Sequence, residues 1–266
     1  MGMRIESQDA FAFHRIGGRA DAGVVILCDH ARNVLPPEYG SLGLAASEFQ
    51  RHIAYDIGAE AIATEVARQL DVPAVFSHFS RLLIDINRGL DDPTLVMRLS
   101  DGAIVPGNRE ADEREVAARV ARFWQPYHSA VAETISACTQ TGVTPVILSL
   151  HSMTDCWKGV KRPWETSILW ADDDRLARPL LDGFAAIPGL IVGDNEPYHG
   201  RLEGDTLWQH AHGSGLAGAI IEYRQDLVGD VRGQKLWADR TVALMRAILQ
   251  RRCPVLHQVR RQELRV

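Results

Sequence analysis

The chain has little cysteine and no excess of positive charge. Its four cysteines, Cys28, Cys138, Cys156 and Cys253, lie far apart and never form a CxxC pair, so a zinc-ribbon or thioredoxin-type motif is absent. Reduced thiols in a cytoplasmic protein are the default for this spacing. The formal net charge of −5 gives no electrostatic reason to expect a nucleic-acid partner or binding to an anionic membrane.

Long apolar runs are also missing. No stretch approaches the ~20 apolar residues that a membrane span needs, and the segment MGMRIESQDAFAFHR has no apolar centre of signal-peptide length. We therefore expect no membrane partner and a cytoplasmic location. Internal repeats and low-complexity linkers are absent too, and 266 residues, 46% of them hydrophobic, suffice for one large core. This predicts a single domain over residues 1–266.

Short apolar runs alternate with longer amphipathic segments along the chain. The runs are rich in β-branched residues and predict buried strands, at residues 24–28, 74–76, 82–86, 146–150, 190–192 (the weakest) and 219–223. Apolar spacings of three and four predict helices at residues 57–70, 113–138 (with Pro126 as a possible bend) and 234–251. Strands that alternate with helices indicate an α/β fold whose largely parallel sheet is covered on both faces.

Polar side chains stand where four of the predicted strands end. His30 follows the first strand, Arg88 follows the run at 82–86, His151 follows the run at 146–150, and Glu222 and Arg224 alternate at the end of the last strand. In parallel sheets ligands bind beyond the carboxyl ends of the strands. We therefore expect these side chains to converge on one edge of the sheet.

The residue types at this edge suit the hydrolysis of an amide in an anionic substrate. Two neutral imidazoles and a carboxylate can hold a zinc ion and leave one coordination position open for water. The zinc ion then makes that water nucleophilic and polarises the carbonyl of the substrate. Glu222 is the candidate that would take the proton and pass it to the leaving amine. Arg88 and Arg224 are candidates for a bidentate pair with a substrate carboxylate.

Six ordered segments of the chain carry a resemblance to a known family. The segments CDHARNVLPPEYGSLGL, HIAYDIGAEAIA, SRLLIDINRG, LSLHSMTD, DNEPYHG and IEYRQDL resemble the N-formylglutamate amidohydrolase family. The resemblance implies a single-domain, three-layer α/β sandwich with a mostly parallel, mixed sheet, of the phosphorylase/hydrolase-like kind found in zinc carboxypeptidases and aspartoacylases. It also implies hydrolysis of N-formyl-L-glutamate, or a related small acidic N-acyl amino acid, to formate and glutamate in histidine degradation.

The resemblance implies roles for particular residues as well. In those relatives an Asn-Arg pair follows one strand, a His-Ser pair follows another, and a catalytic Glu comes late in the chain. Asn87-Arg88, His151-Ser152 and Glu222 stand in that order here. Asn87 and Arg88 would therefore bind the substrate, and Tyr198 with His199, in DNEPYHG, would cover it.

The chain departs from the pattern His-x-x-Glu that supplies two zinc ligands in carboxypeptidases, because Asn33 stands at the fourth position. A neutral amide is a poor zinc ligand. We therefore expect the zinc ion to be held by His30, His151 and Asp56, the last at the start of a predicted helix. Asp56 is equally suited to capping that helix, so the sequence leaves both roles open, zinc ligand and helix cap.

Other interpretations of the same residues remain. Arg88 is also suited to a structural pair with Asp85 or Asp226, and Arg224 to a surface pair with Asp226. The function has alternatives as well: a deacylase or carboxypeptidase-like enzyme for another acidic substrate, or a non-catalytic relative that binds an acidic metabolite. A non-catalytic relative would be marked by loss of His30, His151 or Glu222, and all three are present.

Overall fold

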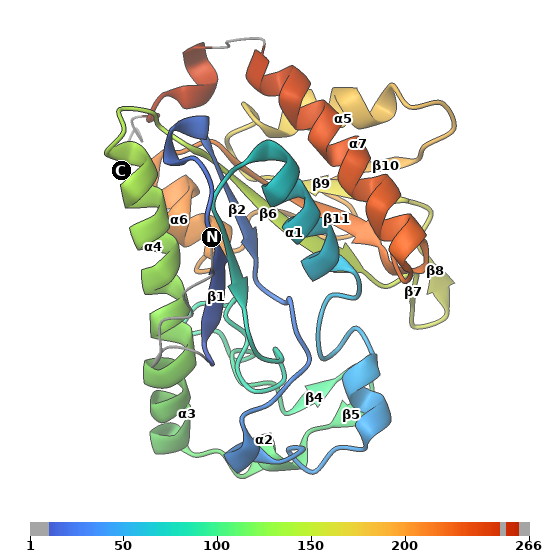
Figure 1. Ribbon diagram of the computed structural model, residues 1–266. Helices are drawn as coiled ribbons and strands as arrows, with labels where there is room; N and C mark the ends of the chain where they lie inside the picture. Colours follow the sequence, from blue (N-terminus) through green and yellow to red (C-terminus); the bar gives the residue numbers. More distant parts are fainter. Residues whose placement is uncertain (1–10, 251–253, 261–266) are drawn as a thin grey trace.

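The computed structural model describes residues 11–250 and 254–260 and is built around a seven-stranded sheet (Figure 1). The strand order is β1-β3-β2-β6-β11-β9-β10. Strands β3, β2, β6 and β11 run parallel, while β1 is antiparallel to β3, β9 is antiparallel to β11, and β10 is parallel to β9. The predicted mostly parallel, mixed sheet is therefore confirmed. The bounds are β1 (Phe13–Ile16), β2 (Val24–Cys28), β3 (Ala74–Ser77), β6 (Val146–Met153), β9 (Thr166–Leu169), β10 (Val192–Asp194) and β11 (Gly218–Arg224).

Helices cover both faces of the sheet, which gives the predicted three layers (Figure 1). Along β2, Val24 and Ile26 pack in a core with α1, α5 and α7, whereas Val25 and Leu27 face a second core with α4 and α6. This alternation follows from the period of two in a strand. The helices are α1 (Ala59–Leu70), α2 (Pro106–Arg109), α3 (Glu113–Arg119), α4 (Gln125–Thr139), α5 (Ala177–Ala185), α6 (Thr206–His210) and α7 (Val231–Gln250).

Smaller elements lie in the connections. Two short hairpins, β4 (Leu99–Ser100) with β5 (Ala103–Ile104) and β7 (Cys156–Trp157) with β8 (Val160–Lys161), lie outside the main sheet. Single 3-10 turns occur at Ala20–Ala22, Pro37–Tyr39, Ala46–Gln50, His212–Ser214, Gln225–Leu227 and Pro254–His257. None of the helices in the described part of the chain has the length and apolar character that crossing a bilayer requires. Three of the cysteines are free thiols, Cys28, Cys138 and Cys156, while Cys253 lies outside the described residues.

Most predicted elements are present. The runs at 24–28, 74–76, 146–150 and 219–223 are β2, β3, β6 and β11, and the run at 190–192 ends where β10 begins. The helices predicted at 57–70 and 234–251 are α1 and α7. The segment 113–138 is helical throughout, but a π-helical turn, Val120–Trp124, separates α3 from α4 just before Pro126. A π turn is a known way to accommodate an interruption in a long helix.

The strand predicted at residues 82–86 is wrong. The run is fully buried, but its backbone turns: Leu83 N–H donates to Ser80 O, and Asp85 N–H donates to Leu95 O. A short apolar run shows burial and not conformation. Two strands of the seven-stranded sheet were not predicted, β1 and β9, and both lie antiparallel beside the parallel centre of the sheet.

A pair of histidines, the buried His128 and the partly buried His210, joins α4 to α6. The Nε2–H of His128 donates to Ile86 O at 3.0 Å, which leaves its Nδ1 to accept from His210 Nε2 at 2.8 Å. Burial lowers the pKa of both rings from 6.5 to about 4. The folded protein therefore holds both rings neutral in a pH range where the unfolded chain is protonated.

We expect this pair to make the fold sensitive to acid. Between pH 6.5 and 4 the unfolded state binds more protons, so the free energy of unfolding falls as the pH falls through this window. The loss is roughly 3 kcal/mol per histidine at most. His210→Gln keeps a donor for His128 but does not titrate, so thermal unfolding of this variant should decline less steeply from pH 6.5 to 4. Parallel curves for parent and variant would show that the pair has no such effect.

Candidate active site

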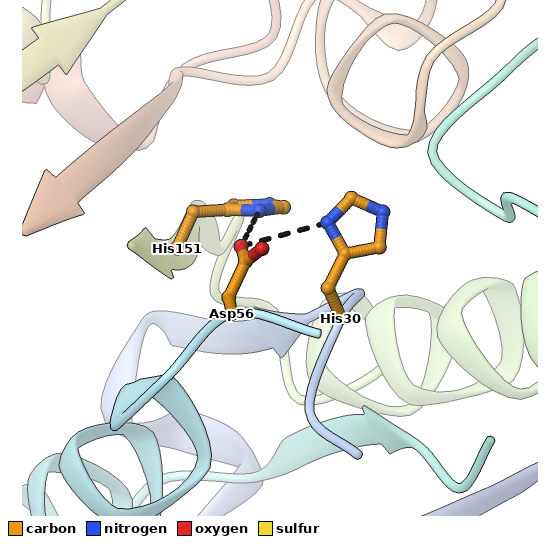
Figure 2. Close-up of side chains that lie close together, drawn as sticks. All are labelled: His30, Asp56 and His151. Carbon is orange, nitrogen blue, oxygen red and sulfur yellow. Dashed lines mark hydrogen bonds and ion pairs between the residues drawn. The ribbon is translucent and has the colours of Figure 1, made fainter. Parts of the chain in front are cut away.

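Two histidines and an aspartate meet at the carboxyl ends of β2 and β6 (Figure 2). The Oδ2 of Asp56 lies 2.8 Å from His151 Nδ1 and 3.5 Å from His30 Nδ1. The ligand atoms of the three residues all lie within 4.8 Å of one another. Asp56, His30 and His151 are 4%, 2% and 3% exposed. The sequence placed these residues at one edge of the sheet, and the structure brings them together.

The chain path before α1 directs Asp56 into this cluster. The N-cap of α1 is Gly58 and not Asp56. Gly58 has a φ of +81°, and a Cβ there would lie 2.3 Å from Val228 O, so the turn requires glycine. Asp56 precedes this turn, and its carboxylate accepts from Ser152 N–H at 3.3 Å in addition to facing the histidines. The capping alternative for Asp56 is therefore wrong.

Two further carboxylates orient the imidazole rings. Asp85 Oδ1 lies 2.7 Å from His30 Nε2, and Asp29 Oδ2 lies 3.1 Å from His151 Nε2. Each carboxylate is placed to accept the Nε2 proton, so Nδ1, which faces Asp56, is the ring nitrogen that a metal ion between the rings would use. A carboxylate on the far nitrogen is the usual support of a metal-ligating histidine. Sequence reasoning did not assign these roles, although both aspartates lie in the quoted segments.

The cluster fits a metal ion. His30 Nδ1 is buried and has no hydrogen-bond partner, although buried polar nitrogens are normally satisfied. Burial opposes ionisation of Asp56, but His30 and His151 hold the pKa of its carboxyl well below the usual value. An anionic carboxylate and two directed imidazole nitrogens are ligands that zinc prefers. Among the described residues, His30, Asp56 and His151 are the group with metal-ligand spacing.

Glu222 lies directly beside the cluster. It is the residue of β11 paired with His151 of β6 in the parallel register, so both side chains leave the same face of the sheet. Glu222 is 9% exposed, and its Oε2 is buried without a hydrogen-bond partner. Burial raises the pKa of Glu222 to about 7. A carboxylate with a raised pKa and a free oxygen is suited to proton transfer near neutral pH.

The cluster and Glu222 open into a cavity of about 400 Å³. Asn87, Arg88, Tyr198 and His199, all expected near the substrate, line it together with His30, Asp56, His151 and Glu222. The volume is that of a small-molecule site. The predicted convergence of His30, His151 and Glu222 therefore produces one cavity.

Arg88 is free of strong ion pairs. Its guanidinium donates to Asn87 O at 2.7 Å and to Thr94 Oγ1 at 3.3 Å, and the nearest carboxylate oxygen, of Asp92, is 3.8 Å away. Asp85 is instead paired with Arg81, at 2.6 Å. The structure thus gives neither of the ion pairs, with Asp85 or Asp226, that were the structural alternatives for Arg88.

Arg224 and Asn33 lie outside the cavity. Arg224 is paired with Asp226 at 2.7 Å and is not a lining residue, so the surface pair describes it and the structure does not bring it to the site. Arg224 is the last residue of β11, and the 3-10 turn Gln225–Leu227 that follows contains its partner Asp226. Asn33 donates to Phe49 O at 2.6 Å, which is consistent with a cluster that does not use it.

Three charged residues of the cavity region were not predicted. Arg81 lines the cavity, pairs with Asp85 and lies 3.7 Å from Asp56 Oδ1. Asp205 also lines it, and burial raises the pKa of Asp205 to about 7. Arg162 donates to Tyr198 Oη at 2.7 Å. The one available signal was the spacing of Arg81 and Asp85 in SRLLIDINRG, which the strand assignment obscured.

The fold and the cluster together define an α/β protein with a potential metal centre at the carboxyl edge of its sheet. Residues 22–228 match the N-formylglutamate amidohydrolase family. The chain therefore belongs to the N-formylglutamate amidohydrolase family. Membership of this hydrolase family supports an enzyme that acts as an amidohydrolase.

Solved structures agree with this assignment. A gene product of Agrobacterium tumefaciens is 33% identical with a TM-score of 0.84, over 91% of this chain and 96% of that one. The N-formylglutamate amidohydrolase from Ralstonia eutropha JMP134 is 21% identical with a TM-score of 0.69, over 91% of this chain and 98% of that one. At this identity the second likeness shows the fold alone. No functionally curated protein sequence matches the chain significantly.

Proposed function

We propose that the protein is a zinc-dependent amidohydrolase that cleaves N-formyl-L-glutamate to formate and glutamate, or a closely related acidic N-acyl amino acid to the corresponding carboxylate and the free amino acid. The observation that carries the proposal is the position of Glu222, a buried carboxylate with a free oxygen, beside the His30–Asp56–His151 cluster in one cavity. The substrate and the place of the reaction in histidine degradation rest on the family resemblance.

His30, Asp56 and His151 would hold the metal ion. The buried Nδ1 of His30, which has no hydrogen bond, supports this role, and so do the carboxylates of Asp85 and Asp29 behind the two rings. Bound zinc supplies Lewis acidity, which activates water and polarises a carbonyl at neutral pH. The carboxylates behind the rings fix which nitrogen is available, so the chain itself orients the ligands.

Glu222 would carry the proton. Its carboxylate takes a proton from the attacking water as the new C–O bond forms, and the resulting carboxylic acid gives it to the amide nitrogen as the C–N bond breaks. The products are formate and a free amine. Burial raises the pKa of Glu222 to about 7, which suits a residue that must both accept and release a proton.

Asn87 and Arg88 would bind the α-carboxylate of the substrate. Arg88 has donors that no close carboxylate of the described residues uses, and a guanidinium binds a carboxylate through two parallel hydrogen bonds. The backbone carbonyl of Asn87 receives one Arg88 N–H at 2.7 Å, which helps hold the guanidinium at the cavity. Tyr198 and His199 would cover the substrate from the loop that carries them.

Protein purified without chelator is expected to contain about one zinc ion per chain and to hydrolyse N-formylglutamate. His30→Ala and His151→Ala should each abolish stoichiometric metal, because only two ligands remain. The measurement is metal analysis by mass spectrometry. His78→Ala removes a histidine outside the cavity and serves as the control. Full metal retention in both cluster variants would remove the zinc proposal.

A further inference from the structure

Arg162 is a buried cation without a counter-ion. It follows β8 directly and is 7% exposed. Its Nη2 donates to Tyr198 Oη at 2.7 Å, and its guanidinium carbon lies 4.8 Å from the centre of the Tyr198 ring. Its Nη1 is buried and has no hydrogen-bond partner. Within residues 11–250 and 254–260, no carboxylate oxygen lies within 4.0 Å of this guanidinium.

Among the described residues, the other arginines with little exposure each have a carboxylate partner. Arg119, 2% exposed, pairs with Glu115 at 2.7 Å. Arg81 pairs with Asp85 at 2.6 Å, and Arg175 pairs with Asp173. A buried charge without a partner costs several kcal/mol, and a ligand that supplied an anion would offset this cost. Arg162 therefore differs from its counterparts in a way that packing does not explain.

Arg162 lies next to the cavity. Its partner Tyr198 is a lining residue and is 45% exposed. Besides burial, the positive charge of Arg162 affects the pKa of two other lining residues: it opposes the rise in the pKa of Glu222 and lowers the pKa of His52. Arg162 forms no ion pair with Glu222. The Tyr198 ring and hydroxyl thus cover a cationic group that an anionic group of a ligand reaches if Tyr198 moves aside.

We propose that Arg162 binds a second carboxylate of the substrate, on its side chain, while Arg88 binds the α-carboxylate. This rests on the proposed function and deepens it, because it makes the enzyme selective for dicarboxylic N-acyl amino acids. The third cation, Arg81, is already paired with Asp85 and lies beside the cluster, 3.7 Å from Asp56. Arg162 is a single guanidinium with unused N–H donors, and one guanidinium binds one carboxylate through two parallel hydrogen bonds.

The test compares two substrates that differ only in side-chain charge. N-formylglutamate and N-formylglutamine have the same length, but the second ends in a neutral amide. Arg162→Met should lower kcat/KM for N-formylglutamate roughly 100-fold, as for loss of a buried charge-assisted contact, mainly through KM. For N-formylglutamine the loss should be a few-fold at most. The parent's preference for the acidic side chain should therefore collapse.

Two variants control the comparison. Arg122→Met removes an exposed arginine, paired with Glu38 far from the cavity, and should leave both substrates unaffected. Arg162→Lys keeps the charge but loses the two-donor fork, and should show a smaller loss confined to N-formylglutamate. Thermal unfolding and metal content establish that Arg162→Met is folded, and Arg162→Lys carries the test where it is not. Equal fold-losses on both substrates would overturn the role of Arg162.

Binding without turnover separates this inference from the proposed function. By calorimetry, glutarate, with two carboxylates, should bind the parent more tightly than butyrate, with one, and Arg162→Met should abolish the difference. A parent that hydrolyses no formyl amino acid but shows this difference would contradict the proposed function and support the second-carboxylate site. Equal binding of glutarate by parent and Arg162→Met would overturn that site.

Discussion

Replacing Glu222 with Gln is expected to lower kcat by about 10²- to 10⁴-fold, the usual range for loss of a general acid–base. Gln has the same shape but does not accept the proton from water or return it to the leaving amine. The metal content and thermal unfolding temperature should be nearly unchanged, because Glu222 is not one of the three clustered ligand residues and its Oε2 has no hydrogen-bond partner to lose. Steady-state kinetics and metal analysis on the same preparation check both parts.

The role of Glu222 follows from whether the Glu222→Gln variant loses turnover alone or turnover together with metal. Glu133→Gln, at an exposed glutamate paired with Arg15, makes the same chemical change away from the cavity and should behave as the parent. Near-normal turnover in Glu222→Gln would show that Glu222 has a structural role and does not transfer the proton. A loss of metal in parallel with activity would instead assign it to the metal centre.

The sequence predicts the parts of the site that strands position. His30, His151 and Glu222 follow or end buried runs that are unambiguous as strands, and the parallel sheet brings such ends to one edge. The register of β11 against β6 then places Glu222 beside His151, because these two residues are paired. The same argument predicts Arg224, two residues further along and the last residue of β11, but its guanidinium pairs with Asp226 and does not line the cavity. The period of two fixes the face of the sheet from which a side chain leaves, but not where a long side chain ends.

Loops account for what the sequence does not predict. Arg81 precedes a buried apolar run whose composition predicts a strand, but the backbone turns there, and the turn lets Arg81 pair with Asp85 four residues later. Arg162 follows the two-residue strand β8, and its hydrogen-bond partner Tyr198 lies 36 positions later in the chain. Neither contact has a periodic signature, because loop paths depend on tertiary packing that periodicity does not encode.

Arg88→Ala is expected to cost about 2–5 kcal/mol in kcat/KM for N-formylglutamate, or about 30- to 4000-fold, because a substrate carboxylate loses a charge-assisted bidentate partner. Arg88→Lys should fail almost as badly, since it keeps the charge but loses the fork. The structure favours this role over a structural one: Asp85 is held by Arg81 and His30, and Asp92 Oδ2 is 3.8 Å from the Arg88 guanidinium.

The loss should depend on the substrate. A formyl amino acid with its α-carboxylate amidated offers Arg88 no anion, so it should be a poor substrate for the parent and barely worse for either variant. If Arg88 mainly holds its own loop, through Asn87 O and Thr94 Oγ1, both variants should instead unfold at lower temperature and weaken every substrate alike. The specificity constant for both substrates in parent and variants decides between these roles, and equal fold-losses would rule out the binding of the α-carboxylate by Arg88. Because Arg162 is proposed to bind the other carboxylate, the α-amide should remain sensitive to Arg162→Met, so the two arginines are separable by substrate.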